Sequence, residues 1–342
     1  MMRNFIIGII IVFMLGLAGF MLLGKANKII WDENKKGKQI LSWKQSANSL
    51  SLLNNGEIVW QLNYDKDKDK PYFYPLRTPS GINLALERPD DHPWHRGLWF
   101  AWKYINGVNY WEEEPGTGLS EGRSLIKNVV IEERDDFSAK IKIDIDYSPN
   151  LESPIMSENR TLLISPPDKN GNYTIDWHHR FTANDDTVTL DRTPPARYGG
   201  EQWGGYAGLG YRADDNELSS IRFINSEGWT NRESLIGFGK RANWMDLTGI
   251  STESQSKKAG LTIFDHPSNP RHPSPWYIWY NNDGDGTSQN YNHAFFQPAL
   301  LFNEPFQLAP AKSFELKYRV LVHSGALTMD ELSKRYQMYI KN

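Results

Sequence analysis

The sequence of 342 residues predicts an all-β fold, a large antiparallel β-sandwich with a short C-terminal helix. Two observations lead to this fold class. Short runs of alternating apolar and polar residues recur along most of the chain, separated by clusters of Gly, Pro, Asn and Asp. A single clear helix pattern lies near the C-terminus, without the strand–helix–strand rhythm of a parallel sheet.

The first 27 residues are expected to lie outside this sandwich. Residues 5–23 form a run of nineteen residues without a polar side chain. As a helix this run would rise about 28 Å, close to the roughly 30 Å of a bilayer core. A cleaved signal peptide would have a shorter apolar region of about 7–15 residues, although Gly24-Lys25-Ala26 is a passable cleavage site. We favour an uncleaved signal anchor over a signal peptide, and with either we expect residues 28–342 to form one exported domain.

The expected strands follow in order along that domain. Residues 139–147 and 314–322 alternate apolar and polar side chains throughout, which is typical of half-buried antiparallel strands. Shorter strand patterns lie at 49–53, 58–63, 128–132, 161–165, 187–191 and 261–264. Asn54-Asn55-Gly56 between the first two of these predicts a hairpin. The helix should begin at a capping box from Thr328 to Glu331, because apolar residues follow it at helical spacing.

Composition excludes several classes of protein. Lys and Arg number 38 against 41 Asp and Glu, a net charge of −3, so a strongly basic nucleic-acid binder is excluded. The lack of cysteine excludes disulfides, thiolate zinc sites, iron–sulfur clusters and a cysteine nucleophile. The mean hydropathy of −0.59 excludes a protein with many membrane spans. Thirteen Trp residues in such a hydrophilic chain suggest an aromatic-lined surface as well as a core.

The densest group of chemically active residues lies between 71 and 111. It contains Asp91, His92, His95, Arg96 and four of the Trp residues, Trp94, Trp99, Trp102 and Trp111. Imidazole can act as an acid, a base or a metal ligand near neutral pH, and a guanidinium can hold an anionic oxygen. For any single one of these residues, a structural role and a functional role are about equally plausible. The concentration of all of them in one loop-rich stretch favours a functional site.

Residues 173–182 read as a strand with two different faces. His179 should share the face of the aromatic and apolar residues, and His178 should lie on the other face with Asp176 and Arg180. Two adjacent histidines on a regular strand cannot both bind one ion. We expect His179 in the core, whereas His178 could face either a polar cleft or solvent.

Two further loops are candidates. Residues 197–212 are rich in glycine but lack a phosphate-binding motif, so we expect close backbone approach beside Tyr206 and Glu201. Glu201 is the best isolated carboxylate for a general base, or else a surface residue. Residues 264–276 display polar groups between prolines, which suits binding or simple stiffening. Residues 281–286 resemble the start of a calcium loop, but Asn292 replaces its final Glu, so a plain turn is favoured.

The motifs PYFYPLRTPSG (71–81), DHPWHRGLWFAW (91–102), NGVNYW (106–111), GYAGLGYR (205–212) and DHPSNPRHPSPW (265–276) resemble a family of exported bacterial proteins of uncertain function. That family is often labelled "methane oxygenase PmoA", a label that conflicts with a chain having at most one membrane span. The resemblance implies a galactose-mutarotase-like super-sandwich whose concave sheet binds sugars. Tyr74 and Trp94 stand where many members have histidine, so the resemblance does not carry a metal site over to this chain.

Sugars are bound by aromatic platforms together with carboxylates, His and Arg, which is the mixture found in these segments. The leading hypothesis is an exported carbohydrate-active enzyme in which His92, His95 or His178 moves a proton, with Glu201 or Asp91 as partner. Arg96 and Arg271 would hold an oxygen of the substrate. The platform and the remaining sugar contacts would come from Trp94, Trp99, Trp276, Tyr206, His266 and Asn269. An epimerase, a hydrolase and a lyase all remain open.

Two alternative functions remain open. A non-catalytic glycan-binding module, held at the membrane by residues 5–23, would need the aromatic residues but no acid–base pair. A divalent metal bound by His92, His95 and His178 is the other, and no further cofactor is expected. The expected partners are a carbohydrate and the membrane, without nucleic acid. The expected location is the periplasm or the outer face of the cytoplasmic membrane.

Overall fold

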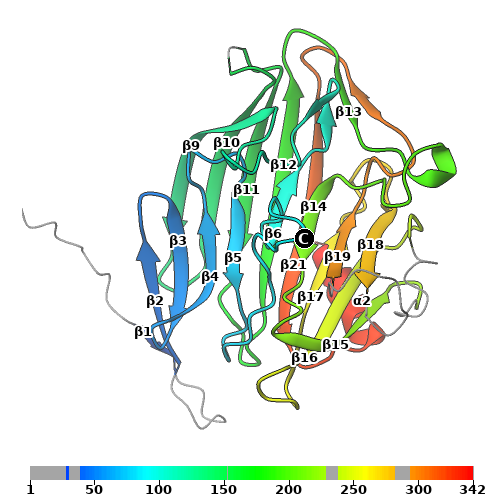
Figure 1. The fold of residues 1–342 in the computed structure, drawn as a ribbon. Helices are drawn as coiled ribbons and strands as arrows, with labels where there is room; N and C mark the ends of the chain where they lie inside the picture. The colour runs from blue at the N-terminus through cyan, green and yellow to red at the C-terminus, as the bar shows by residue number, and fades with distance from the viewer. Residues whose placement is uncertain (1–27, 31–38, 152, 229–237, 282–292, 342) are drawn as a thin grey trace, which may run out of the picture.

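The computed structural model describes residues 28–30, 39–151, 153–228, 238–281 and 293–341. Two large antiparallel sheets face each other, and in Figure 1 the nine-stranded sheet lies in front of the eight-stranded one. The nine-stranded sheet has the order β1-β2-β3-β4-β5-β6-β14-β19-β18, and the eight-stranded sheet has the order β15-β16-β17-β21-β12-β11-β10-β9. A small sheet, β20-β13-β7-β8, lies at one end of the sandwich.

The strands of the nine-stranded sheet are β1 (Lys28–Ile30), β2 (Gln39–Gln45), β3 (Ser49–Asn54), β4 (Glu57–Asn63), β5 (Tyr72–Leu76), β6 (Leu98–Ala101), β14 (Gly208–Arg212), β18 (Trp276–Asn281) and β19 (His293–Pro298). Those of the eight-stranded sheet are β9 (Arg123–Glu133), β10 (Ala139–Ser148), β11 (Met156–Ile164), β12 (Tyr173–Ala183), β15 (Leu218–Asn225), β16 (Trp244–Ser251), β17 (Lys258–Asp265) and β21 (Ser313–Ser324). The small sheet contains β7 (Tyr104–Ile105), β8 (Val108–Asn109), β13 (Val188–Asp191) and β20 (Phe306–Leu308). The helical elements are the 3₁₀ turn η1 (Ala196–Tyr198) and α2 (Met329–Tyr339).

The predicted fold class is confirmed, and each predicted strand lies within or overlaps an observed one. The predicted hairpin joins β3 to β4, with Asn55 and Gly56 at φ values of 53° and 88°. These left-handed conformations are those that a two-residue hairpin turn needs. The capping box at the start of α2 is also present, because the Thr328 side chain accepts from the backbone of Glu331 while the Glu331 side chain accepts from the Thr328 backbone.

The main core fills the space between the two large sheets. Alternate residues of each strand point into it, as β12 shows with buried Trp177, His179 and Phe181. His178 lies on the opposite face of the same strand, as the alternation predicts. The prediction that His179 is a core histidine is therefore confirmed.

A second aromatic cluster lies on the outer face of the nine-stranded sheet. Leu98 and Phe100 of β6 belong to the main core, so Trp99 between them points outward. We call its members the outer aromatic cluster: Trp99, Ala101, Trp111, Tyr206, Tyr277, Phe295, Ala299 and Phe302. Gly210 of β14 makes room for it, because a Cβ there would lie 3.1 Å from Phe295 and 3.4 Å from Trp99.

Helix α2 covers part of the outer face of the eight-stranded sheet, on the far side in Figure 1. Its Leu332, Tyr336 and Tyr339 pack with Trp244 and Phe264. In the described part of the chain no helix is long and apolar enough to cross a membrane. The predicted anchor at residues 5–23 lies outside the described residues, as does most of the calcium-like turn at 281–286.

Candidate functional site

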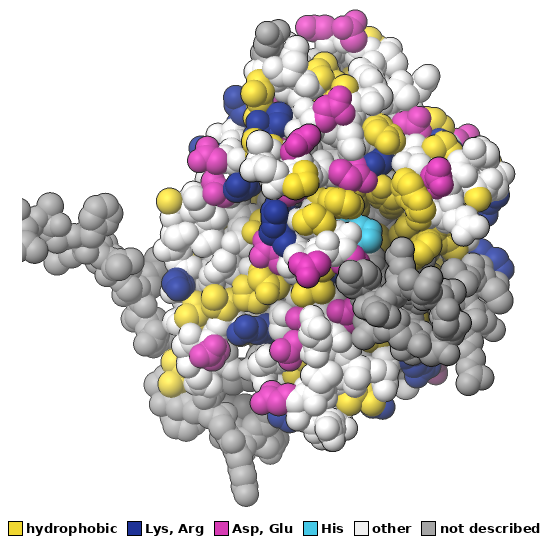
Figure 2. Space-filling view, viewed as in Figure 1, with side chains coloured by type: hydrophobic (Ala, Val, Ile, Leu, Met, Phe, Trp, Pro, Cys, Tyr) yellow, Lys and Arg dark blue, Asp and Glu magenta, His cyan; other side chains and the backbone are white. Residues whose placement is uncertain are grey.

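The loop between β5 and β6 brings two histidines onto the outer aromatic cluster. Gly97 ends this loop at a φ of 73°, and a Cβ there would lie 2.7 Å from the carbonyl oxygen of Phe73, so only glycine fits. His95 is buried, with its ring stacked 4.6 Å from that of His92 and 5.1 Å from that of Phe295. Trp94 meets the ring of His92 edge-on at 5.4 Å. Figure 2 shows hydrophobic side chains gathered beside a histidine on this face.

A hydrogen bond to a carboxylate orients the more exposed of these histidines. The His92 side chain is 36 % exposed, and its Nδ1 lies 2.8 Å from Oδ2 of Asp91. Buried Arg212 donates to both oxygens of Asp91, at 3.1 and 3.3 Å. An ionised Asp91 accepts a hydrogen bond from Nδ1–H, which makes Nε2 the basic nitrogen of the neutral ring. The arrangement prepares His92 to accept and donate protons at the surface of the aromatic cluster.

A second titratable group, Asp215, lies just beyond β14. Burial raises the pKa of Asp215 to about 6, although the positive charge of Arg212 acts against this shift. Its Oδ2 is buried and has no hydrogen-bond partner among the described residues. Sequence reasoning missed Asp215, because it follows Asp214 in what reads as a polar turn. Asp214 is structural, since Asn83 Nδ2 donates to its Oδ2 at 2.7 Å.

The other side of the cluster is held by a polar contact to the loop that follows β8. The hydroxyl of Tyr206 donates to Oε1 of Glu112 at 2.7 Å, and Lys103 is ion-paired with the same carboxylate. The Tyr206 ring lies 5.0 Å from that of Trp111, which in turn lies 5.4 Å from Trp99. Tyr206 therefore belongs to the outer aromatic cluster, and its expected contact with a sugar stays a prediction.

A pocket of about 210 Å³ is lined partly by β4 and β5 of the same sheet. We call it the polar pocket, and its lining residues include Ser49, Asn63, Lys70, Tyr72, Arg96 and Glu113. Arg96 is ion-paired with Glu113, and Lys70 Nζ lies 2.9 Å from the same carboxylate. Arg96 therefore lines the polar pocket in an ion pair, and its expected role of holding an oxygen of the substrate stays a prediction.

The proline-rich loop after β17 is held by hydrogen bonds within the protein. Asn269 donates to Asp265 and to the Lys317 carbonyl oxygen, and Arg271 donates to three other backbone carbonyl oxygens. His266 is hydrogen-bonded to Ser268 within the loop. Trp276 and Trp99 are both fully buried, Trp276 in the main core and Trp99 in the outer aromatic cluster, so neither can serve as a surface platform. The expected sugar contacts of His266, Asn269 and Arg271 stay predictions.

Two other predicted residues lie on other elements of the fold. His178 is on the outer face of the eight-stranded sheet, opposite the outer aromatic cluster, and Glu201 is exposed on the loop after η1. The predicted set of His92, His95 and His178 is therefore not brought together. Among the residues that the structure describes, no group of three His, Asp or Glu side chains is placed to hold a metal ion.

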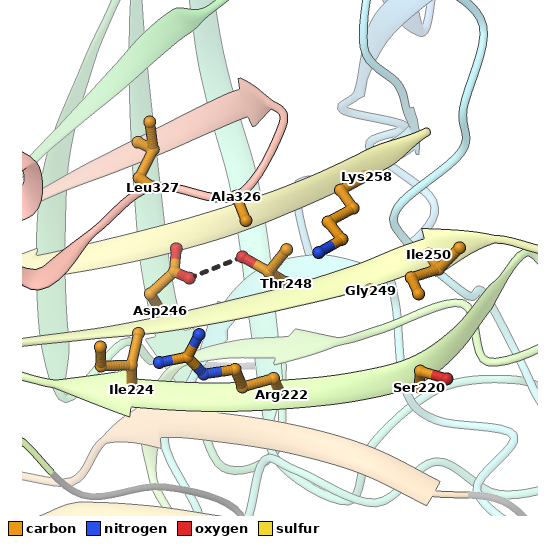
Figure 3. Close-up of a pocket in the computed structure, with 10 residues that line it drawn as sticks. All are labelled: Ser220, Arg222, Ile224, Asp246, Thr248, Gly249, Ile250, Lys258, Ala326 and Leu327. Carbon is orange, nitrogen blue, oxygen red and sulfur yellow. Dashed lines mark hydrogen bonds between the residues drawn. The ribbon is translucent and has the colours of Figure 1, made fainter. Parts of the chain in front are cut away.

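A smaller pocket of about 90 Å³ lies on the outer face of the eight-stranded sheet (Figure 3). Arg222 of β15 and Lys258 of β17 flank the strand that carries Asp246 and Thr248. Asp246 is buried and accepts hydrogen bonds from Thr248 and Thr262. This pocket lacks an exposed aromatic wall and lies opposite His92, so the outer aromatic cluster remains the candidate site.

Fold and site together define a two-sheet β-sandwich protein with a carboxylate–histidine pair beside a buried aromatic cluster. Residues 49–337 match the "Family of unknown function (DUF6807)", and the chain belongs to this family. The description of the family names no activity, and it does not support the methane-oxygenase label. No curated protein matches the sequence.

Several solved structures are similar in arrangement. A putative aldose 1-epimerase from Klebsiella pneumoniae is 11% identical, with a TM-score of 0.43 and 92% of each chain covered. A galactose mutarotase related enzyme from Lactobacillus acidophilus is 9% identical, with a TM-score of 0.38, 83% of this chain covered and 97% of the other. A polysaccharide lyase is 13% identical, with a TM-score of 0.33, and the match covers 88% of this chain but 34% of the lyase. Because these TM-scores lie below 0.5, they carry no inference about the chemistry of this chain.

Proposed function

We propose that the protein is a carbohydrate-active enzyme that uses His92 for acid–base chemistry on a sugar bound at the outer aromatic cluster. The observation that carries this proposal is the Asp91–His92 pair, whose partly exposed imidazole lies between Trp94 and the buried ring of His95. The half-buried ring of Trp94, at the edge of this cluster, can stack on the C–H face of a sugar, while the imidazole and nearby polar groups reach its hydroxyls.

Each residue of the pair has its own role. His92 takes a proton from a sugar hydroxyl or gives one to the anomeric oxygen, through Nε2. Asp91 is a positioning residue, because it holds Nδ1 and favours the imidazolium that forms when Nε2 is protonated. Arg212 in turn fixes both oxygens of Asp91.

Asp215 supplies a second group that titrates near neutral pH. Its buried oxygen and its raised pKa of about 6 suit a carboxyl that alternates between acid and base. Epimerisation, hydrolysis and elimination all use an acid and a base, so the proposal covers acid–base chemistry on a sugar in general. We further propose that the apolar residues 5–23 place the enzyme outside the cytoplasm, either anchored or released.

The test is a panel of mono- and oligosaccharides assayed for binding and for turnover. We expect His92→Gln to fold and bind but to lose about 100-fold or more in turnover. His178→Gln on the opposite face is the matched control and should match the wild type. Unchanged turnover in His92→Gln would overturn the assignment.

The second candidate function is a non-catalytic glycan-binding module. It is favoured by Trp203, whose side chain is exposed near Tyr206, with 6.1 Å between the two rings. An exposed ring of this kind can stack on a sugar without any acid–base step. Binding of a glycan by the wild type without turnover of any member of the panel would support this function instead of the enzyme.

A further inference from the structure

The polar pocket and the outer aromatic cluster are joined by one row of residues across the sheet. The strand register pairs Ser49 with Asn63, Asn63 with Tyr72, and Tyr72 with Trp99. The residue next to each of them along its strand, Leu50, Leu62, Phe73 or Leu98, belongs to the main core, so the row faces outward. Four neighbouring strands place its two ends about 14 Å apart, three strand spacings. That length exceeds the width of a single sugar ring.

The polar pocket has the chemistry of a site for an uncharged, hydroxyl-rich group. The charged side chains that line it are three cations, Lys68, Lys70 and Arg96, and three anions, Asp65, Asp69 and Glu113. Lys70 and Arg96 pair with Glu113, and Asp69 pairs with Arg123. Paired charges still offer hydrogen-bond donors and acceptors to a ligand. Because their electric fields largely cancel, they do not favour a charged ligand over an uncharged one. At about 210 Å³ the pocket is several times the roughly 30 Å³ of a water molecule.

Tyr72 is the wall shared by the two regions. Its ring packs against the outer aromatic cluster, and it also lines the polar pocket. The guanidinium carbon of Arg96 lies 5.6 Å from the centre of the same ring. The row therefore places the edge of the outer aromatic cluster and the polar pocket on the same face of the sheet, with Tyr72 adjoining both.

We infer that the ligand is an uncharged oligosaccharide, with one unit at the outer aromatic cluster beside His92 and a following unit in the polar pocket. This inference rests on the proposed function and extends it from a sugar to a chain of at least two units. It assigns the polar pocket, which takes no part in the acid–base step, to recognition of chain length.

Calorimetric binding of matched series tests the inference. The probes are glucose, galactose, mannose and xylose, their α- and β-linked di- and trisaccharides, and galacturonate oligomers of the same lengths. We expect at least a tenfold gain in affinity from the monosaccharide to the di- or trisaccharide of one neutral series. Ser49→Tyr fills the polar pocket and should remove that gain while leaving monosaccharide affinity unchanged.

Ser157→Tyr is the matched control, because Ser157 is also a half-buried strand residue but lies on the outer face of the eight-stranded sheet. It should keep the gain. If Ser49→Tyr fails to fold, Lys68→Ala at the exposed rim of the pocket replaces it and should weaken only the longer ligands.

The outcomes separate the inference from the proposed function. A wild type that binds monosaccharide and oligosaccharide equally, or a gain that survives filling of the pocket, overturns the inference while His92-dependent turnover still stands. Preference for the galacturonate series overturns the uncharged ligand. Failure of every sugar to bind overturns the inference and the proposed function together.

Discussion

Asp215 and Asp91 are two carboxylates near one guanidinium, and burial separates their roles. Asp91 is held by Arg212 at both oxygens, whereas Asp215 keeps a buried oxygen without a hydrogen-bond partner among the described residues. Since burial raises the pKa of Asp215 to about 6, the folded chain keeps a proton between about pH 4 and 6 that the unfolded chain loses. The stability that Asp215 contributes is therefore lost as the pH rises through 6.

This pH dependence of stability predicts the behaviour of the Asp215→Asn variant. Above pH 6 the variant avoids the cost of the buried charge, so we expect it to be more stable than the wild type by about 1 kcal/mol after allowance for solvent screening. The difference should vanish near pH 4, and turnover should fall. Urea unfolding at pH 7.5 and pH 4, with exposed Asp186→Asn as the control, measures it. A variant that is less stable at pH 7.5 would contradict the pKa assignment.

Individual residues also show how far the candidate site could be read from the sequence. The segment from Asp91 to Arg96 stands out because histidine, arginine and tryptophan rarely gather in one loop without a role. Trp276 looked similar, yet its neighbours along β18 do not reveal which face of the strand it occupies. Asp215 carries no sequence signal, because its pKa depends on burial by elements distant in the chain.

The strands likewise divide into those that the sequence pattern predicts and those that it does not. Alternation identifies β10, β12 and β21, because one face of each meets the core and the other meets polar surroundings. It fails for β6 and β14, in which every residue is buried, because the outer aromatic cluster covers their outer face. Local pattern also cannot give the order in which β6 pairs with β14, a contact between segments more than 100 residues apart.

Asp246 of β16 joins three strands of the eight-stranded sheet. Its carboxylate accepts from Thr262 of β17 at 2.6 Å and lies 2.8 Å from His323 Nε2 of β21. Asp144 of β10 has a comparable arrangement, with Asn128 and Asn159 on the adjacent strands, but its hydrogen bonds are exposed to solvent. The two aspartates differ mainly in burial.

Alanine at each position should therefore have different consequences. Asp246→Ala leaves buried partners without an acceptor, and we expect it to lower the free energy of unfolding by about 3 kcal/mol. Asp144→Ala exposes its partners to water and should cost less than about 1 kcal/mol. Chemical denaturation of both variants at pH 7.5 compares them. Equal losses would show that burial does not set the strength of these cross-strand contacts.

The whole sandwich encloses a charged network in its main core. Glu158 accepts from Arg160 Nε at 2.7 Å, and its Oε1 lies 2.7 Å from Nδ1 of His179. All three side chains are almost completely buried between the sheets. Burial lowers the pKa of His179 to about 4, even though its contact with Glu158 acts in the opposite direction. The folded protein therefore favours the neutral form of the His179 imidazole.

This network makes the stability of the whole molecule sensitive to acid. Between pH 6.5 and 4 the unfolded chain binds a proton at residue 179 that the folded chain excludes, so stability falls as the pH drops through that range. The expected loss is about 3 kcal/mol for a fully buried histidine. His179→Gln keeps a donor for Glu158 but cannot titrate, so its stability should be lower at pH 7.5 and should change less down to pH 4.5. Unfolding by urea at pH 7.5, 5.5 and 4.5 measures the slope, and an unchanged slope in His179→Gln would assign the acid sensitivity to other groups.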